Sequence, residues 1–334
     1  MAEIAASAHY HAASSVGRLA APPWVSPNRG HVAASDSRYD TSDPMILLTG
    51  ATGVIGSALL PQLLGAGHDV RCLVRDPRRL GPSRVNVQLA LGDLGDPQGI
   101  RHSLRGIETV IHLAAAIRDQ PPRRLEEING LGTLRLLQAA ERSGVRRFVF
   151  FSAIGATEIQ RTRFFRAKAL AERAVLDSRI ESTVFAPSIV SDLHDPWVTL
   201  IRQLALLPVL PISGSGAARF QPLWAQEAAR CVAADLELDR DGSRRYELAG
   251  PETLSYDEMA RTITAACGRR RVLLHIPTPL VRSALIALRR IVGDSAFATW
   301  EEAELMEISM VSERGAADVR ELWGEPSPMA GVLR

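Results

Sequence analysis

The chain has 334 residues, of which 46% are apolar and 23% charged, and its formal net charge is +2. This composition is typical of a globular protein. No apolar run reaches the roughly 18 residues of a membrane-spanning helix, and the nearly balanced charge argues against a nucleic-acid partner. The cysteines Cys72, Cys231 and Cys267 lie far apart, so they predict no metal site and suit a reducing compartment such as the cytoplasm.

Arginine almost completely replaces lysine in this chain. Its 39 basic residues include a single lysine, Lys168. An ammonium and a guanidinium are not interchangeable in compact or geometrically demanding sites. The retained lysine is therefore a candidate functional residue, and retention by chance is the alternative.

Residues 1–43 have neither a helical nor a strand period. The segment is rich in Ala and Ser, is interrupted by three prolines and is closed by Pro44. We expect a disordered tail. An organelle transit peptide is the alternative, because the segment has a single acidic residue, Glu3, up to Ala34. The apolar core of a secretory signal is missing.

From Met45 onward, short apolar segments alternate with amphipathic ones. This alternation predicts right-handed crossovers and a parallel sheet. We expect an α/β fold, with a Rossmann-type doubly wound sheet over residues 44–186. The expected strands are 45–49, 69–75, 85–90, 109–113, 148–152 and 182–186, and the expected helices are 53–64, 125–143 and 164–177.

After Pro187 the alternation loosens. We expect residues 187–334 to form a smaller α/β substrate-binding cap that is interleaved with the Rossmann core. The segments 198–210 and 279–292 predict an apolar helix and a basic amphipathic helix. Such helices cover a core, or they contact a membrane surface or an apolar ligand such as a quinone or isoprenoid. The other expected elements are helices at 225–236 and 255–266 and strands at 245–249 and 272–276.

The segment Gly50-Ala51-Thr52-Gly53-Val54-Ile55-Gly56 follows the first expected strand and opens the first helix. At this spacing Gly50 permits a tight turn, Gly53 lets backbone N–H groups approach a pyrophosphate, and Gly56 lets the helix pack closely on the strand. The helix N-terminus then presents free donors and a positive dipole end to the phosphates. This context favours dinucleotide binding over a merely structural turn.

The end of the second expected strand bears on the choice between NAD and NADP. A site for NAD usually has an acidic residue there, on the ribose 2′-hydroxyl. Here the strand ends at Arg75, and Arg78 and Arg79 follow. Because a guanidinium suits a 2′-phosphate, we expect NADP(H) rather than NAD(H). Asp76 keeps the NAD alternative open.

Several further segments match a known family. They are 49–56, 92–94, 112–116, 129–133, 148–152, 164–172, 186–188, 219–222 and 246–251. With these motifs the chain resembles the short-chain dehydrogenase/reductase (SDR) superfamily, in its extended and atypical branches, over about residues 45–277. It is similar to the NmrA-like group, to the NAD-dependent epimerase/dehydratase family and to the SDR-type accessory subunit of respiratory complex I.

The resemblance implies a set of cofactor contacts. Asp93 and Leu94 would lie beside the adenine. Pro187 and Ser188 would approach the nicotinamide, and the two alanines after the fourth strand would line the cleft. The expected cofactor-binding residues are Gly50, Thr52, Gly53, Val54, Ile55, Gly56, Arg75, Asp93, Leu94, Ala114, Ala115, Lys168, Pro187 and Ser188.

In active members of the family a tyrosine stands four residues before the lysine on one helix. Its hydroxyl is the general acid/base, and the lysine lowers its pKa and holds the nicotinamide ribose. Here Phe164 takes the tyrosine position before Lys168, and none of the four tyrosines fits the motif. We expect Lys168 to bind the ribose, with an exposed helix lysine as the alternative. Ser152 is the other catalytic candidate, through a substrate carbonyl, and a serine that satisfies backbone groups is its alternative.

Two functions remain open from the sequence. The first is an NAD(P)(H)-binding accessory or redox-sensing protein with little or no classical dehydrogenase activity, in contact with a membrane periphery or a complex. The alternative is an NADP-dependent oxidoreductase with a non-standard proton donor, acting on a small carbonyl, quinone or isoprenoid-like substrate. The missing tyrosine favours the first, because general acid–base catalysis contributes typically about 10²–10⁴-fold.

Overall fold

The computed structural model describes residues 45–238, 242–292 and 299–333, without the side chains of 288, 289, 291 and 292. The expected tail, residues 1–43, lies outside the described residues. The disorder predicted for it, and the transit-peptide alternative, therefore stay predictions.

A seven-stranded parallel sheet forms the core, in the order β11-β6-β5-β4-β1-β2-β3. This order confirms the predicted Rossmann-type α/β fold. The strand order reverses at β1, which pairs in parallel with β2 on one side and with β4 on the other. The strands are β1 Met45–Thr49, β2 Val70–Val74, β3 Gln88–Leu91, β4 Ile107–His112, β5 Arg147–Phe151, β6 Glu181–Pro187 and β11 Arg244–Leu248.

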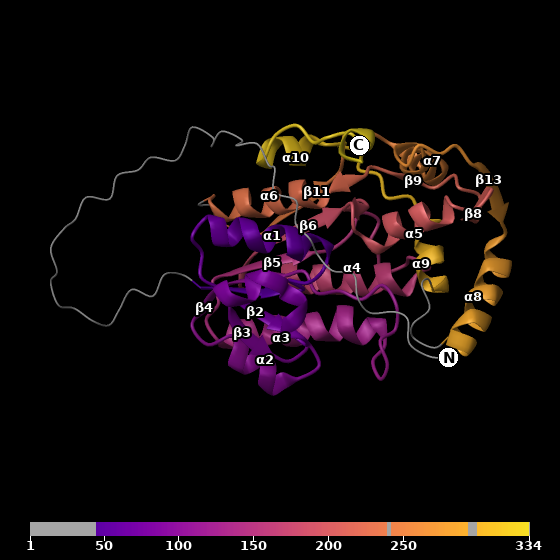
Figure 1. The fold of residues 1–334 in the computed structure, drawn as a ribbon. Helices are drawn as coiled ribbons and strands as arrows, with labels where there is room; N and C mark the ends of the chain where they lie inside the picture. The colour runs from indigo at the N-terminus through magenta and orange to yellow at the C-terminus, as the bar shows by residue number, and fades with distance from the viewer. Residues whose placement is uncertain (1–44, 239–241, 293–298, 334) are drawn as a thin grey trace, which may run out of the picture. The chain divides into compact units, whose positions relative to one another are not determined.

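Helices cover both faces of this sheet (Figure 1). Successive side chains of a strand point to opposite faces: Ile46 and Leu48 of β1 pack in one apolar cluster, and Leu47 packs in the other. Burial on both sides explains why the central strands β1 and β5 read as nearly unbroken apolar runs. One layer contains α1 Val54–Gly65, α6 Ala225–Leu236 and α10 Ala317–Leu322, and the other contains α2 Pro97–Ser103, α3 Gly132–Arg142 and α4 Arg163–Leu176.

The chain after Pro187 both completes these layers and adds a smaller part. β11 pairs with β6, and α6 lies in the same layer as α1. Three two-stranded sheets join β7 to β10, β9 to β12 and β8 to β13. Their strands are β7 Val190–Ser191, β8 Val209–Ser213, β9 Arg219–Phe220, β10 Leu223–Trp224, β12 Leu254–Ser255 and β13 Val272–Ile276, and the remaining helices are α5 Pro196–Leu204, α7 Tyr256–Ala266, α8 Thr278–Val292, α9 Trp300–Leu305 and α11 Met329–Val332.

Two predicted helices differ from the structure. The apolar helix predicted over 198–210 is wrong in its second half, since α5 ends at Leu204 and β8 begins at Val209. Pro208 stands between them and cannot continue a helix. The long helix predicted over 125–143 is divided, because Glu127–Leu131 forms a π-helical turn before α3.

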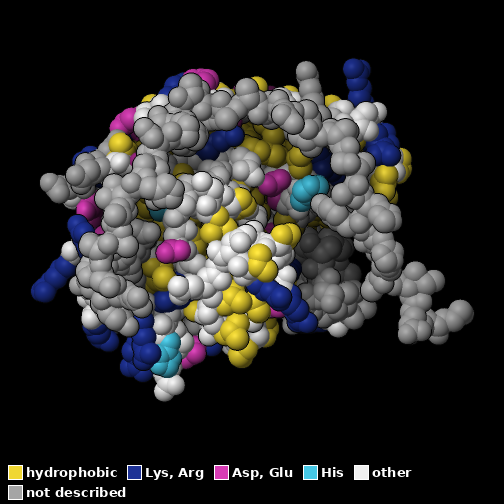
Figure 2. All heavy atoms as spheres, turned by 60° about the vertical axis from the view of Figure 1, so that its left-hand side comes forward, with side chains coloured by type: hydrophobic (Ala, Val, Ile, Leu, Met, Phe, Trp, Pro, Cys, Tyr) yellow, Lys and Arg dark blue, Asp and Glu magenta, His cyan; other side chains and the backbone are white. Residues whose placement is uncertain are grey.

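The described surface carries charges of both signs. On the face drawn in Figure 2, arginine, carboxylate and apolar side chains are interspersed. Within the described ranges, no helix combines the length and the apolar character that crossing a membrane requires. In the same part of the chain, His, Cys, Asp and Glu side chains form no group of three or more that could hold a metal ion.

Candidate dinucleotide site

A cavity of about 660 Å³ opens at the carboxyl ends of β1, β2 and β4. Open α/β sheets bind ligands at this place, where the strand order reverses, and the volume falls within the roughly 300–1,000 Å³ of small-molecule sites. The cavity is lined mainly by residues 49–53, 73–76, 92–95, 113–115 and 120–123. Among the predicted cofactor residues, the lining includes Gly50, Thr52, Gly53, Arg75, Asp93, Leu94, Ala114 and Ala115.

Gly50 and Gly56 leave no room for a side chain. A Cβ on Gly50, whose φ is +76°, would lie 2.5 Å from the backbone nitrogen of Ala114. A Cβ on Gly56 would lie 2.1 Å from the carbonyl oxygen of Gly50. Backbone atoms cannot rotate away as a flexible side chain can. The two glycines therefore allow β1, β4 and α1 to approach closely, and this brings the start of α1 to the cavity.

The first turn of α1 supplies hydrogen-bond donors. Gly53 is its N-cap, without a side-chain cap and with no acidic residue in the first turn. The N–H of Gly53 donates to the carbonyl of Gly50 at 3.0 Å and closes the loop. The N–H groups of Val54 and Ile55 begin the helix, where such groups lack an intrahelical acceptor. These donors, the positive end of the helix dipole and the absence of a competing carboxylate fit a pyrophosphate.

The end of β2 presents a cation to the cavity and a carboxylate that is already paired. Arg75 is exposed there, and its Nη1 donates to Oε1 of Gln120 at 2.7 Å. Asp76 accepts from both the backbone N–H and the Nε of Arg78, each at 3.0 Å. The hydrogen bond from the Arg78 side chain holds the pKa of Asp76 below its ordinary value. The group that would favour NAD is thus engaged in capping the following turn.

Asp93 is tied to the loop that follows β4. Its Oδ1 accepts a very short hydrogen bond from Arg123 and another, of 2.7 Å, from the N–H of Gly95. Burial raises the pKa of Asp93, but the hydrogen bonds from Arg123 and Gly95 outweigh it and hold that pKa below its ordinary value. An adenine that contacts the Asp93 carboxylate would therefore have to share this acceptor with Arg123.

Two cationic lining residues were missed from the sequence. Arg123 lies in the loop after β4, and Arg135 lies on α3. The available signal was position, because the loop after β4 borders the point where the strand order reverses. Neither residue belongs to a glycine motif or stands at a predicted strand end.

Lys168 is buried on α4 and does not line this cavity. Its Nζ donates to the carbonyl of Phe151 at 2.5 Å and lies 4.8 Å from the ring centre of Phe150. Burial lowers the pKa of Lys168 to about 7, against the opposing effect of the Glu172 charge. The alternative of an exposed helix lysine is therefore wrong, and the ribose contact stays a prediction.

Ser152 also has its partner within the protein. Its hydroxyl donates a very short hydrogen bond to Glu172. The other oxygen of that carboxylate accepts from Nε of Arg245 at 2.6 Å. Ser152 is thus joined to Glu172, which lies one turn after Lys168 on α4. Neither Ser152 nor Glu172 lines the cavity.

Pro187 and Ser188 lie at the end of β6, likewise outside the lining. The Ser188 hydroxyl is buried, donates to the carbonyl of Met310 at 2.6 Å and accepts from the N–H of Gln221 at 2.9 Å. These bonds attach a C-terminal segment to the core. The predicted approach of both residues to the nicotinamide stays a prediction.

His112 ends β4 and is buried. Its Nδ1 lies 2.7 Å from the hydroxyl of Thr49, and its Nε2 lies 2.9 Å from the hydroxyl of Thr133. Burial, followed by the charge of Lys168, lowers the pKa of His112 to about 3. The ring is therefore neutral at physiological pH and links β1 and β4 to α3.

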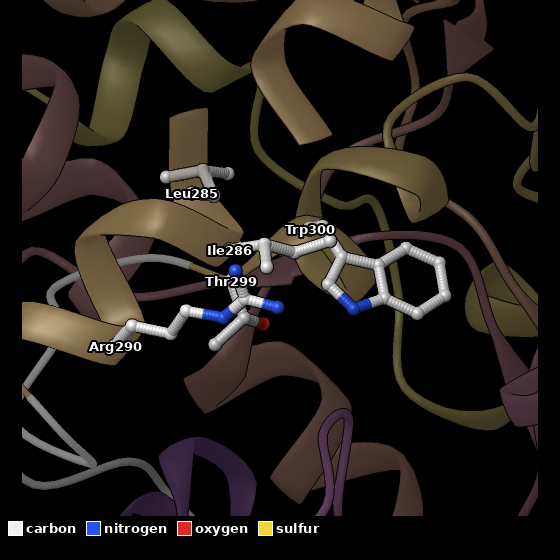
Figure 3. Close-up of a pocket in the computed structure, with 5 residues that line it drawn as sticks. All are labelled: Leu285, Ile286, Arg290, Thr299 and Trp300. Atoms are coloured by element: carbon white, nitrogen blue, oxygen red, sulfur yellow. The ribbon is translucent and has the colours of Figure 1, made fainter. Parts of the chain in front are cut away.

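A smaller cavity of about 330 Å³ lies between α8 and α9 (Figure 3). It is lined by Leu285, Ile286, Arg290, Thr299 and Trp300. The guanidinium of Arg282 lies 4.5 Å from the Trp300 ring centre. These five lining residues contain neither a carboxylate nor an imidazole, so they offer no acid–base pair.

Residues 50–202 match a protein-family model described as NAD(P)H-binding. The match covers the glycine loop, Arg75, Asp93 and Lys168. Over these residues the chain is therefore similar to NAD(P)H-binding domains. Most of the cavity described above lies within the matched residues.

Three curated relatives illustrate the range of this domain. The NADH dehydrogenase [ubiquinone] 1 alpha subcomplex subunit 9, mitochondrial, of Arabidopsis thaliana is 27% identical over 76% of this chain and 66% of that protein. Photosystem II assembly factor Ycf39 of Guillardia theta is 27% identical over 71% of this chain and 74% of its own. Sterol demethylase protein B of Methylococcus capsulatus is 41% identical over 34% and 35%. The chain thus spans just under two thirds of the first and about a third of the last.

Solved structures agree with the fold. A nucleoside-diphosphate-sugar epimerase from Staphylococcus aureus superposes with a TM-score of 0.70 over 86% of this chain and 99% of its own. The two sequences are 19% identical. At that identity the likeness concerns the Rossmann-type architecture alone.

Proposed function

We propose that this protein binds NADP(H) as an accessory or redox-sensing factor with little or no classical dehydrogenase activity. The observation that carries the proposal is Phe164, whose ring centre lies 6.0 Å from Nζ of Lys168 and brings no hydroxyl to that position. The two tyrosines of the described ranges, Tyr246 and Tyr256, are buried in the core and do not line the cavity. A bound dinucleotide would then stabilise the folded chain rather than react.

The names of two relatives support an accessory role. One is named as a subunit of NADH dehydrogenase and the other as a photosystem II assembly factor. We extend this to the present chain as a contact with a larger assembly. A cytoplasmic location, with import through the N-terminal tail as the alternative, belongs to the same proposal.

The function is tested by restoring the missing hydroxyl. The wild-type protein is expected to bind NADPH and to reduce no member of a panel of carbonyls and quinones. Phe164→Tyr is expected to gain reductase activity, because a positioned general acid contributes typically about 10²–10⁴-fold. NADPH oxidation followed by absorbance measures both, and Phe164→Leu is the matched control. Reductase turnover by the wild-type protein, at a rate equal to that of an active Phe164→Tyr variant, would contradict the accessory role.

The preference for NADP(H) is proposed from Arg75. Arg75→Ala is expected to weaken NADP binding by roughly 10- to 100-fold, because a charge-assisted hydrogen bond contributes about 1.5–3 kcal/mol. NAD binding should change by less than about twofold, since NAD lacks the 2′-phosphate. Calorimetric titration with both dinucleotides measures this. Arg78→Ala, which removes only the side-chain partner of Asp76, is the control, and an equal loss for both dinucleotides after Arg75→Ala would refute the assignment.

A second candidate function is an NADP-dependent oxidoreductase with a non-standard proton donor and a carbonyl, quinone or isoprenoid-like substrate. The lowered pKa of Lys168, about 7, favours it, because a catalytic acid works best when its pKa is near the working pH. Turnover that depends on a group titrating near pH 7, and that is lost in Lys168→Met, would select this candidate.

A further inference from the structure

The sheet formed by β8 and β13 exposes large apolar side chains on one side. Val209 and Val272 are register partners in this parallel pair. Val209 is 39% exposed, Val272 72% and Leu274, two residues along β13, 50%. The alternate residues Leu210 and Ile212 are buried in the core. The inner side of this small sheet is therefore packed, and the outer side is not.

Neighbouring segments extend the exposed side. Leu206 and Leu207, directly before β8, are 65% and 46% exposed, and Leu280 at the start of α8 is 62% exposed. Figure 1 shows α8 continuing from the end of β13, the strand that pairs with β8. Of the 15 large apolar side chains exposed in the described residues, six lie here, so they form a patch rather than the usual scatter. We call this patch the β8–β13–α8 face: Leu206, Leu207, Val209, Val272, Leu274 and Leu280.

Three consecutive arginines, Arg269, Arg270 and Arg271, directly precede β13 at one end of this face. Carboxylates of other elements reach the opposite end, where Asp257 lies 2.9 Å from Nε2 of His275 and Glu307 accepts a hydrogen bond from Thr278. No Asp or Glu occurs between positions 205 and 216 or between positions 268 and 292. Arg271 is held at one end by a 3.0 Å hydrogen bond to the carbonyl of Ala205. Arg270 precedes it and is exposed. Arg282 and Arg290 instead face α9 and do not belong to this face.

The helix α8 presents its outer side in the same way. Leu285 and Ile286 border the cavity against α9 (Figure 3). Leu280, Ala284 and Ala287 are exposed. The helix is therefore held by one apolar edge and leaves small and apolar side chains free for a second contact.

We propose that the β8–β13–α8 face docks on an anionic lipid bilayer. Its apolar side chains lie at the boundary between headgroups and acyl chains, and the guanidinium groups of Arg269, Arg270 and Arg271 at one end of the face bind lipid phosphates. A second copy of the chain is the competing occupant, and the experiment distinguishes the two. The proposal does not involve the dinucleotide site, so it stands or falls independently of the proposed function.

Vesicle flotation with the full-length chain tests this docking. Binding is expected to vesicles of phosphatidylcholine with about one third phosphatidylglycerol, and not to phosphatidylcholine alone. Because the contact includes surface charges, high salt is expected to weaken it. The variant Val272→Glu/Leu274→Glu should reduce binding at least about tenfold, since burial of each apolar side chain contributes about 1.5–3 kcal/mol. Both positions are exposed, so NADPH affinity should stay unchanged and report an intact fold.

Val85→Glu is the matched control, because Val85 is 82% exposed outside this face; it should bind vesicles like the wild type. Three results would overturn the proposal. One is the absence of binding to anionic vesicles. If the chain then self-associates and Leu274→Glu abolishes that association, the occupant of the face is a second copy of the chain. Another is equal binding to neutral and anionic vesicles. The third is undiminished binding by Val272→Glu/Leu274→Glu, which would assign the contact to another part of the chain.

Discussion

Gly56→Ala is expected to abolish dinucleotide binding, with a loss of affinity of at least about 100-fold. The new methyl group would lie 2.1 Å from the carbonyl oxygen of Gly50 and 2.7 Å from Cα of Ala51. Because both are backbone atoms, α1 must move away from β1, and its N-terminal donors then leave the phosphate position. Overpacking of this kind also costs about 1–3 kcal/mol of folding free energy. Calorimetric titration with NADPH and urea denaturation measure the two effects.

Substitutions at two other glycines, Gly53 in the loop and Gly65 at the end of α1, separate loss of dinucleotide binding from loss of the fold. Gly65 ends α1 with no atom within 4 Å of an added Cβ, so Gly65→Ala should bind normally and gain up to about 1 kcal/mol of stability. A Cβ on Gly53 would lie 3.3 Å from the Gly50 carbonyl. Gly53→Ala should therefore fold nearly normally and still bind weakly, because the methyl group occupies the phosphate approach. Wild-type affinity in Gly56→Ala would exclude this loop as the phosphate site.

Lys168→Met is expected to make the ligand-free protein more stable at pH 7. Burial lowers the pKa of Lys168 from 10.5 to about 7, which corresponds to about 5 kcal/mol at about 1.4 kcal/mol for each pKa unit. The substitution also leaves the Phe151 carbonyl without its donor, at a cost of about 1–3 kcal/mol. A net gain of about 2–4 kcal/mol remains. Urea denaturation without dinucleotide measures it.

The same group predicts a pH dependence with a definite sign. Between pH 7 and 10.5 the unfolded chain keeps a proton on Lys168 that the folded chain has released. The contribution of this lysine to the unfolding free energy therefore rises with pH across that window and is constant outside it. Lys168→Met should lose this rise. Lys168→Arg is the opposite control, because arginine stays charged and should destabilise the fold across the whole window.

These variants also test whether Lys168 was retained for binding. If the ammonium holds the nicotinamide ribose, Lys168→Met should gain stability without ligand and lose affinity for NADPH. Opposite effects of one substitution are typical of a functional group kept at a cost in stability. Unchanged affinity for NADPH, together with the gain in stability, would leave the lysine without a role in the dinucleotide site.

Much of the fold followed from local patterns in the sequence. β1, α6 and β13 begin and end at the predicted residues, because apolar period and flanking turns are local properties. The apolar segment 198–210 showed the limit of this reasoning: one helical pattern was predicted across Pro208, where the chain forms two different elements. Val85 was likewise counted in the third strand, although it lies in the 3₁₀-helical segment Pro77–Asn86 that precedes β3.

The sequence by itself determined the parallel sheet and the phosphate loop, since both depend on short-range period and on backbone conformations that only glycine adopts freely. The tertiary structure alone decided which polar groups are already occupied. Asp93 is paired with Arg123, 30 positions away, and Lys168 is buried against Phe150 and the carbonyl of Phe151 on β5. Such pairings, and the burial that lowers the pKa of Lys168, arise only when segments distant in the chain are packed together, so no local pattern records them.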